Sequence, residues 1–103
     1  MGHKTNTLLS KEDIEAHLVP QYKRIVNLVH AYQKPFLLHS CGCIFNVMDT
    51  LIDTVGIDAK HSNEDQIAPF SYWVTTYGDR IGNFGGIDTD AVCRLDKSAM
   101  TEY

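Results

Sequence analysis

Residues 35–43 read PFLLHSCGC, and this stretch decides how the chain is predicted to fold. Pro35 ends the preceding pattern, residues 36–38 (FLL) form an apolar run, and a polar segment begins abruptly at His39. A short apolar run between two such boundaries is typical of a strand buried in a parallel sheet. We therefore expect a strand over 36–38, followed by a loop from His39 to Cys43.

The same arrangement occurs twice more along the chain. Residues 57–60 (IDAK) and 81–84 (IGNF) read as short strands, and each is followed by a polar or glycine-rich loop. His39, His61 and Gly85 each stand directly after a predicted strand, at intervals of 22 and 24 residues. A repeat of strand, loop and helix with right-handed crossovers gives a parallel sheet whose strand-end loops lie on one side. We expect the functional residues to meet there.

Amphipathic helices separate the predicted strands. Ser10 is a suitable N-cap, and Pro20 is expected to kink the first helix or to open a second one. Gly56 stands where a C-terminal glycine cap belongs, and Trp73 is read as a packing or interface residue. The positions expected to face the core recur at steps of three and four: Ile14, Leu18, Tyr22, Ile25, Leu28, Val29 and Tyr32; Ile44, Val47, Met48, Leu51, Ile52 and Val55; and Ile67, Phe70, Val74 and Tyr77.

The composition is that of one small globular domain. The chain has 103 residues, a mass of 11.6 kDa and a formal net charge of -4, and this acidic balance argues against the basic footprint of a nucleic-acid-binding protein. No apolar run approaches the ~18 residues of a membrane span, and residues 1–9 form a polar, irregular tail unlike a signal peptide. Three cysteines without a secretory signal do not form a disulfide framework. We expect a cytoplasmic protein.

The length limits the architecture. A closed barrel of eight strands and eight helices needs ~250 residues, whereas this chain offers three predicted strands. Three strands of such a barrel leave unpaired edges. The sequence therefore predicts an open α/β unit, an oligomer that covers its edges, or a segment of a larger barrel.

Several stretches of the chain resemble the uroporphyrinogen decarboxylase superfamily. They are 34–42 (KPFLLHSCG), 51–53 (LID), 56–59 (GIDA), 77–81 (YGDRI) and 85–88 (GGID), in the order and with the gaps of that superfamily. The resemblance covers about Leu8 to Leu95. It implies a partial (β/α)8 TIM barrel, with this chain as an internal to C-terminal part. The arginine-rich segment and the essential aspartate that the decarboxylases keep near their N-terminus have no counterpart here.

The superfamily has two main branches. Decarboxylases act on the acetate side chains of a tetrapyrrole without a cofactor, whereas methyltransferases move methyl groups between corrinoid proteins and thiols that zinc activates. The second branch carries a His-x-Cys pair after this strand, and His39-Ser40-Cys41 matches it. A distant cysteine that the branch also carries would lie beyond Tyr103. The resemblance therefore implies zinc as cofactor, with His39 and Cys41 as ligands.

The chemistry of these two residues suits that role. Zinc takes thiolate and imidazole ligands, and catalytic sites keep three protein ligands and one exchangeable position. His39 and Cys41 are two apart on an extended segment, so both can face one ion, and Cys43 continues the spacing as the candidate for a third ligand. Metal would hold a substrate thiol as thiolate near neutral pH. The alternative readings are a hydrogen-bonded histidine for His39 and a small buried thiol for Cys41.

Other candidate site residues follow the second and third strands. The resemblance implies that the loop after the second strand lines the substrate cavity and often carries an acidic residue. His61 and Asn63 are therefore expected to contact substrate, and Glu64 to act as an acid, a base or a polar substrate contact. The alternative for Glu64 is the solvated start of a helix. Asp88 is a second catalytic candidate or an N-cap, and Gly86 is expected to let a ligand or a neighbouring loop approach closely.

The function expected from these residues is methyl transfer to a zinc-activated thiol, by a chain that is incomplete as a barrel. Its partners would be a small thiol or tetrapyrrole substrate or a corrinoid protein, and a homo-oligomer is expected. Two alternatives stay open. One is decarboxylation in tetrapyrrole biosynthesis, and the other is a non-catalytic module that self-associates through exposed strand edges.

Overall fold

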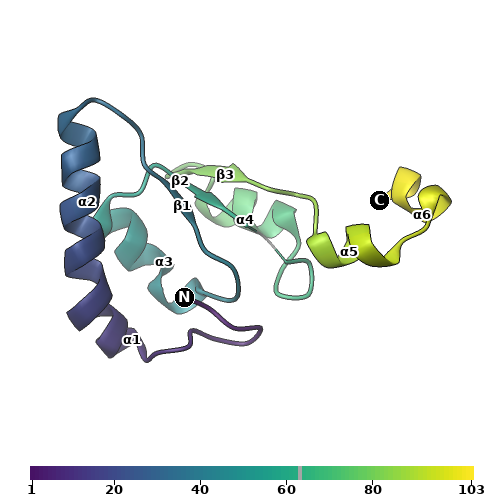
Figure 1. Ribbon diagram of the computed structural model, residues 1–103, viewed down its shortest axis with the longest axis horizontal. Helices are drawn as coiled ribbons and strands as arrows, with labels where there is room; N and C mark the ends of the chain where they lie inside the picture. Colours follow the sequence, from purple (N-terminus) through teal and green to yellow (C-terminus); the bar gives the residue numbers. More distant parts are fainter. Residues whose placement is uncertain (63) are drawn as a thin grey trace.

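The computed structural model describes residues 1–62 and 64–103. Helices and strands alternate from β1 to α5 (Figure 1), so the chain has the mixed α/β character expected from the sequence. In chain order the elements are α1 (Lys11–Asp13), the π-helix η1 (Ile14–Leu18), α2 (Val19–Ala31), β1 (Leu37–His39), α3 (Phe45–Asp49), the π-helix η2 (Thr50–Val55), β2 (Ala59–His61), α4 (Phe70–Tyr77), β3 (Gly82–Phe84), α5 (Thr89–Arg94) and α6 (Lys97–Glu102).

Three short strands form one parallel sheet, as predicted. Its order is β1-β2-β3, and the register pairs Leu38 with Lys60 and Lys60 with Asn83. β1 leads into α3 and η2, β2 into α4, and β3 into α5. Backbone pairing, and not the apolar run, sets the strand limits, so each strand starts one or two residues later than predicted. His39 and His61 are therefore the last residues of their strands.

Helices cover one face of the sheet, and the other face is open. Side chains alternate between the two faces along a strand. Leu38 and Lys60 on one face are 4% and 2% exposed, whereas Leu37 and Phe84 on the other are 50% and 55% exposed. The strands are therefore buried on one face only. When parallel strands follow one another in space, right-handed crossovers all pass over the same face, so no helix of residues 1–62 and 64–103 lies on the opposite face.

A π-helical segment interrupts the first helical rod, which consists of α1, η1 and α2. The Ser10 hydroxyl accepts a hydrogen bond from the Asp13 backbone N–H (3.0 Å) and caps the start of the rod. Pro20 lies in the first turn of α2, as predicted. At the end of η1 the Val19 N–H bonds the Ile14 carbonyl, five residues back. Because of this wider turn, every side chain after it points in a different direction from the one it would have in an uninterrupted α-helix.

The rotation changes the core stripe of this rod. Ile14 is buried as predicted, but Ile25, Leu28 and Tyr32, also expected to face the core, are 50%, 61% and 73% exposed. Val19 and Val26 face the core in their place. From Ile14 to Val19 the spacing is five residues, which a regular helical period does not predict, and from Val19 to Val26 it is seven, two regular turns.

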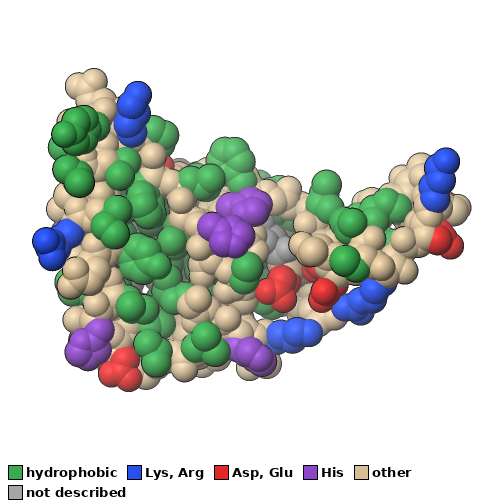
Figure 2. Space-filling model, viewed as in Figure 1, with side chains coloured by type: hydrophobic (Ala, Val, Ile, Leu, Met, Phe, Trp, Pro, Cys, Tyr) green, Lys and Arg blue, Asp and Glu red, His purple; other side chains and the backbone are tan. Residues whose placement is uncertain are grey.

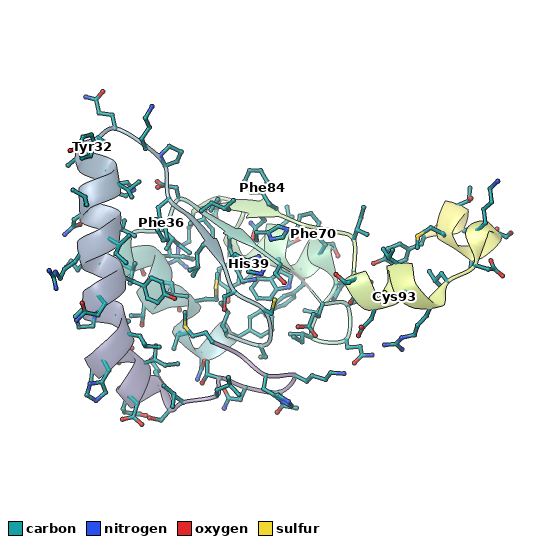
Figure 3. All side chains as sticks on the ribbon, in the orientation of Figure 1. Tyr32, Phe36, His39, Phe70, Phe84 and Cys93 are labelled. Atoms are coloured by element: carbon teal, nitrogen blue, oxygen red, sulfur yellow. The ribbon has the colours of Figure 1, made fainter. Side chains whose placement is uncertain are left out.

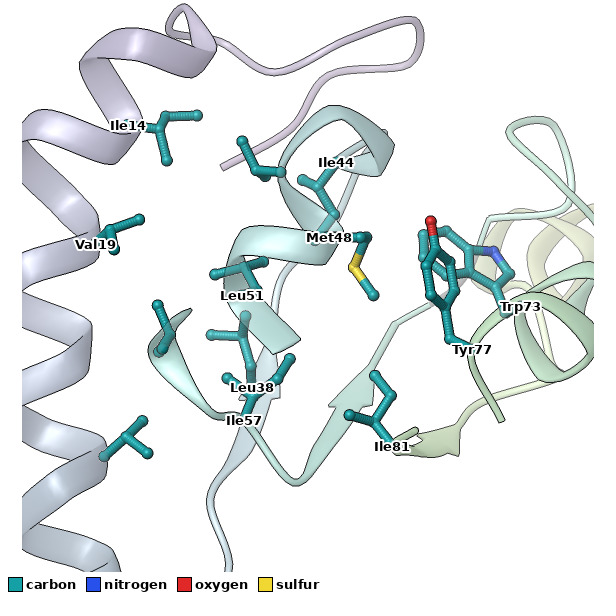
Figure 4. Close-up of a cluster of buried hydrophobic side chains, with 13 residues drawn as sticks. Ile14, Val19, Leu38, Ile44, Met48, Leu51, Ile57, Trp73, Tyr77 and Ile81 are labelled. Atoms are coloured by element: carbon teal, nitrogen blue, oxygen red, sulfur yellow. The ribbon is translucent and has the colours of Figure 1, made fainter. Parts of the chain in front are cut away.

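The predicted stripe over α3 and η2 is confirmed and lies at the centre of the core. Its buried side chains are Ile44, Val47, Met48, Leu51 and Val55. Ile14 and Val19 point toward this stripe from the long helix (Figure 4). Gly56 ends η2 with φ +82°, the left-handed conformation that a glycine cap supplies without strain.

Helix α4 contributes aromatic side chains to the core. Trp73 and Tyr77 are buried, whereas Val74 is 45% exposed. The packing role of Trp73 is therefore confirmed, and the predicted core position of Val74 is wrong. Ile67, expected to begin the same stripe, lies in a turn before the helix, because α4 starts at Phe70. Within so short a helix, positions 73 and 77 are the ones that face the sheet.

Helices α5 and α6 extend away from the sheet at the carboxyl end of the chain (Figure 1). The Asp96 carboxylate caps α6 by accepting a hydrogen bond from the Ala99 N–H (2.9 Å). Across the described ranges, none of the helices combines the length and the apolar character that crossing a membrane requires.

Candidate functional site

His39 and His61 end two neighbouring strands and stand side by side. The parallel register pairs them directly, and their ring centroids are 5.0 Å apart. The two Nδ1 atoms are 2.8 Å apart, a hydrogen bond between the rings. Both side chains are exposed on the open face, where histidine side chains gather in Figure 2 and where Figure 3 labels His39. The predicted meeting of the first two strand ends is confirmed.

Cys41 joins the histidines from the loop after β1. Its Sγ lies 3.4 Å from His39 Nε2, and the Ser62 hydroxyl donates a hydrogen bond to the same sulfur at 3.4 Å. His39 and Cys41 thus face one another, as their spacing predicts. We call His39, Cys41, His61 and Ser62 the histidine–cysteine cluster. Its side chains form a hydrogen-bonded row from Ser62 through Cys41 and His39 to His61.

Lys60 supports this cluster from the covered face of the sheet. Its side chain is 2% exposed, its Nζ lies 4.2 Å from the centre of the Trp73 ring, and it donates a hydrogen bond to the Ser62 carbonyl. Burial lowers the pKa of Lys60 to about 8, and the nearby Cys41 and Glu64 partly oppose this change. Ser62 has φ +86°, which is unfavourable for a residue with a side chain. The bond from Lys60 helps to hold Ser62 in that conformation.

The two predicted catalytic acids, Glu64 and Asp88, both bind backbone N–H groups. Glu64 Oε1 accepts a hydrogen bond from the Gly42 N–H at 3.1 Å. Asp88 Oδ1 accepts one from the Asp90 N–H at 2.7 Å, and Oδ2 accepts one from the Asp65 N–H. These bonds, above all the one from Asp65, hold the pKa of Asp88 below its usual range. Asp88 is therefore the ionised N-cap of α5, and Glu64 ties the loop after β2 to the loop after β1.

Gly86, which was expected to let a ligand or a neighbouring loop approach closely, lies instead against the side chain of Phe70. Its φ is +96°, and a Cβ at this position would lie 3.2 Å from a ring carbon of Phe70. The neighbour that this glycine accommodates is thus helix α4. Asn63, the other expected substrate contact in this part of the site, lies outside the described residues.

An open pocket of about 390 Å³ borders the cluster. It is lined by Lys4, Cys41, Ser62, Glu64, Asp88, Thr89 and Asp90. Pockets that hold small molecules have volumes of roughly 300–1,000 Å³, so this one has room for a small substrate. The pocket would place such a molecule beside the Cys41 thiol.

His39 and Cys41 have a separation that suits two ligands of one zinc ion. With Zn–S at ~2.3 Å and Zn–N at ~2.0–2.1 Å, the sulfur and nitrogen ligands of a tetrahedral zinc lie ~3.6 Å apart. The observed distance between Sγ and Nε2 is 3.4 Å. In residues 1–62 and 64–103, however, no three His, Cys, Asp or Glu side chains, Cys43 included, are grouped so as to hold a metal ion. A zinc ion at this pair would thus have two ligands from the described residues, and its remaining positions would be open to water or to other ligands.

Comparison with models of protein families, with curated protein sequences and with solved structures gives no match for this chain. The α/β class is established by the parallel sheet and its helices.

Proposed function

We propose that this chain is part of a (β/α)8 barrel of the uroporphyrinogen decarboxylase superfamily, and that its strand-end cluster serves zinc-dependent methyl transfer to a thiol. The observation that carries the proposal is the 3.4 Å contact between His39 Nε2 and Cys41 Sγ at the carboxyl end of β1. In barrels of this architecture the active site lies at the carboxyl ends of the strands. The same two residues carry the His-x-Cys pattern of the methyltransferase branch.

The winding of the sheet supports a barrel. The strands follow one another in the order β1-β2-β3, and one face of the sheet is open. A doubly wound sheet instead reverses its strand order and has helices on both faces. In a closed barrel the face that carries Leu37, His39 and Phe84 would be the interior, filled by side chains of the other strands. The proposal thus accounts for the exposure of Leu37 and Phe84.

The cluster would bind the metal, and the pocket beside it would bind the substrate. His39 and Cys41 would hold zinc, whose chemical contribution is to keep a bound substrate thiol as thiolate near neutral pH. Ser62 donates a hydrogen bond to the Cys41 sulfur, and Glu64 fixes the following turn through the Gly42 N–H. The pocket bordered by Cys41 would receive the small thiol. A corrinoid protein would present the methyl group at the carboxyl ends of the strands.

Zinc affinity tests the proposed roles of His39 and Cys41. We expect wild-type protein to bind zinc, and His39→Ala and Cys41→Ser each to lose at least about tenfold in affinity, because each removes one of two ligands that the chain supplies. Retained metal is measured by atomic emission after desalting. Cys93→Ser is the matched control, since Cys93 is an exposed thiol on α5 outside the cluster.

Two outcomes of this experiment would contradict the proposal. One is wild-type protein that binds no zinc, and the other is an equal loss of affinity in Cys93→Ser. Zinc binding through the cluster also separates this proposal from tetrapyrrole decarboxylation, which needs no cofactor.

A second candidate role, self-association, is favoured by the open face of the sheet. Leu37 and Phe84 expose about half of their surface there, at 50% and 55%. β1 and β3 are the outer strands of the sheet, so each has an edge that no described strand pairs. Strand edges and exposed apolar patches are places where chains associate. A second copy of the chain would cover both.

Light scattering tests this second role. We expect a mass of at least two chains of 11.6 kDa each, and a return to one chain in Phe84→Asp, because burying an unpaired charge at the interface is costly. Thr75→Asp adds the same charge at an exposed position of α4 and is expected to leave the mass unchanged. A single-chain mass for the wild type at the highest concentration measured would exclude self-association.

A further inference from the structure

We propose that His61 is a positioning residue, which fixes the tautomer of His39 and so aims the Nε2 lone pair of His39 at Cys41. The inference rests on the proposed zinc site and deepens it, because histidine binds a metal through a ring nitrogen that carries no proton. It gives His61 a role different from the substrate contact expected from the sequence.

The contact between the two rings allows two arrangements of protons. A neutral imidazole carries one proton, so one of its nitrogens donates and the other accepts. Because the Nδ1 atoms of His39 and His61 are 2.8 Å apart, one of them donates to the other. If His39 donates, its Nε2 is left with a free lone pair. If His61 donates, the proton of His39 sits on Nε2 and blocks that nitrogen as a ligand.

Cys41 and Ser62 favour the first arrangement. The Ser62 hydroxyl donates to Cys41 Sγ, and the Cys41 thiol is in turn 3.4 Å from His39 Nε2. When His39 donates through Nδ1, each donor of the row, from the Ser62 hydroxyl to the His39 ring, has an acceptor. In the other arrangement the Ser62 hydroxyl and the His39 Nε2–H both point at the sulfur. The thiol proton then has no acceptor among the four side chains of the cluster.

The sheet holds both rings where this hydrogen bond can act. His39 and His61 are paired in the register of β1 and β2, and the Ser40 N–H bonds the His61 carbonyl at 3.3 Å. With both backbones fixed, the bond between the rings sets the orientation of the His39 imidazole. In metal sites the second nitrogen of a histidine ligand is commonly fixed by a neighbouring acceptor, and loss of that partner costs about 10–100-fold in metal affinity. Here an imidazole nitrogen would be the acceptor.

His61→Asn and His61→Leu form the matched pair that tests this role. Asparagine places its Oδ1 near the position of a histidine Nδ1 and keeps an acceptor, whereas leucine has a similar size and none. The tautomer is read from the imidazole nitrogen NMR spectrum of metal-free protein, recorded at a pH at which the spectrum itself shows neutral rings. Signals of His39 are assigned by their loss in His39→Ala. We expect the Nδ1–H tautomer in the wild type and His61→Asn, and the Nε2–H tautomer in His61→Leu.

Cobalt(II), added alone as a spectroscopic substitute for zinc, provides the second readout. We expect its affinity to fall about tenfold or more in His61→Leu and to stay close to the wild-type value in His61→Asn. A role of His61 in folding alone would not be rescued selectively by an acceptor. Circular dichroism of both variants shows whether either has lost its fold.

The two proposals can fail separately. An Nε2–H tautomer of His39 in wild-type protein overturns the role of His61, whether or not metal binds. Equal cobalt affinities of the wild type and His61→Leu overturn it as well. A wild type with the Nδ1–H tautomer and no cobalt binding supports the positioning of His39 by His61 and contradicts the zinc site.

Discussion

Replacing Trp73 with alanine is expected to lower the free energy of unfolding by about 3–5 kcal/mol. Trp73 is 1% exposed, stacks on Phe45 with a centroid distance of 4.5 Å and lies 5.9 Å from Tyr77. Its removal leaves a cavity between α4 and the sheet and takes the aromatic ring away from the Lys60 ammonium. A domain of this size has a total stability of about 5–15 kcal/mol. The substitution therefore removes a large share of it.

Urea unfolding followed by circular dichroism measures this loss, since the chain has one tryptophan and fluorescence disappears with it. Tyr32→Ala is the control, because Tyr32 is 73% exposed and its truncation is expected to cost no more than about 0.5 kcal/mol. Trp73→Phe keeps a ring beside Lys60 and is expected to fall between the two. Equal urea midpoints for Trp73→Ala and Tyr32→Ala would show that α4 does not close the core.

The parallel sheet could be predicted from local patterns. Three short apolar runs, each ending at a polar or glycine-rich loop, place the strands to within two residues. The apolar side chains at regular spacing in residues 44–55 all face the core, so their pattern correctly predicts a helix buried on that side. The same topology predicts that His39, Cys41 and His61 come together, because parallel strands that are neighbours end at the same edge of the sheet.

The errors in the helices have two physical causes. The π-helical turn of η1 shifts the later side chains, so Val26 faces the core in place of Ile25. The spacing of apolar residues in the sequence does not predict such a turn. In α4, Pro69 is the N-cap and delays the start of the helix. Ile67 then lies before the helix, and Trp73 takes the buried position.

The partners of single side chains were the least predictable part of the site. Glu64 and Asp88 look like catalytic acids in the sequence, but which N–H groups they meet depends on loop geometry that the sequence does not encode locally. Lys60 could have been found from its position. In a strand, the residue before the exposed His61 must face the opposite, helix-covered side. A charge at that position predicts a buried lysine with a shifted pKa.

Lys60 is expected to make the stability of the protein depend on pH in the alkaline range. Burial lowers its pKa from 10.5 to about 8 in the folded protein, whereas the unfolded chain keeps the ordinary value. Below the folded-state value the lysine is protonated in both states, and the fold bears the full cost of burying the charge. Between about 8 and 10.5 the unfolded chain binds more protons than the folded one. The free energy of unfolding therefore rises with pH through this window.

The size of the effect follows from the difference between the two pKa values. One pKa unit corresponds to about 1.4 kcal/mol, so the change from 10.5 to about 8 corresponds to about 3.5 kcal/mol across the window. At neutral pH the Ser62 carbonyl and the face of the Trp73 ring offset part of the cost of the buried ammonium. These two contacts explain how the core holds a charged side chain.

Lys60→Met should abolish this pH dependence, because methionine keeps an unbranched side chain of similar length and has no charge. We expect the variant to be at least as stable as the wild type at neutral pH, and its advantage to shrink by about 3.5 kcal/mol as the pH rises to 10.5. Urea unfolding of both proteins at each pH measures the difference, so that other groups titrating in the same range cancel. Lys97→Met, at an exposed position of α6, is expected to keep the wild-type profile. Parallel profiles for the wild type and Lys60→Met would mean that the Lys60 ammonium reaches solvent and that the Ser62 conformation does not need the hydrogen bond from Lys60.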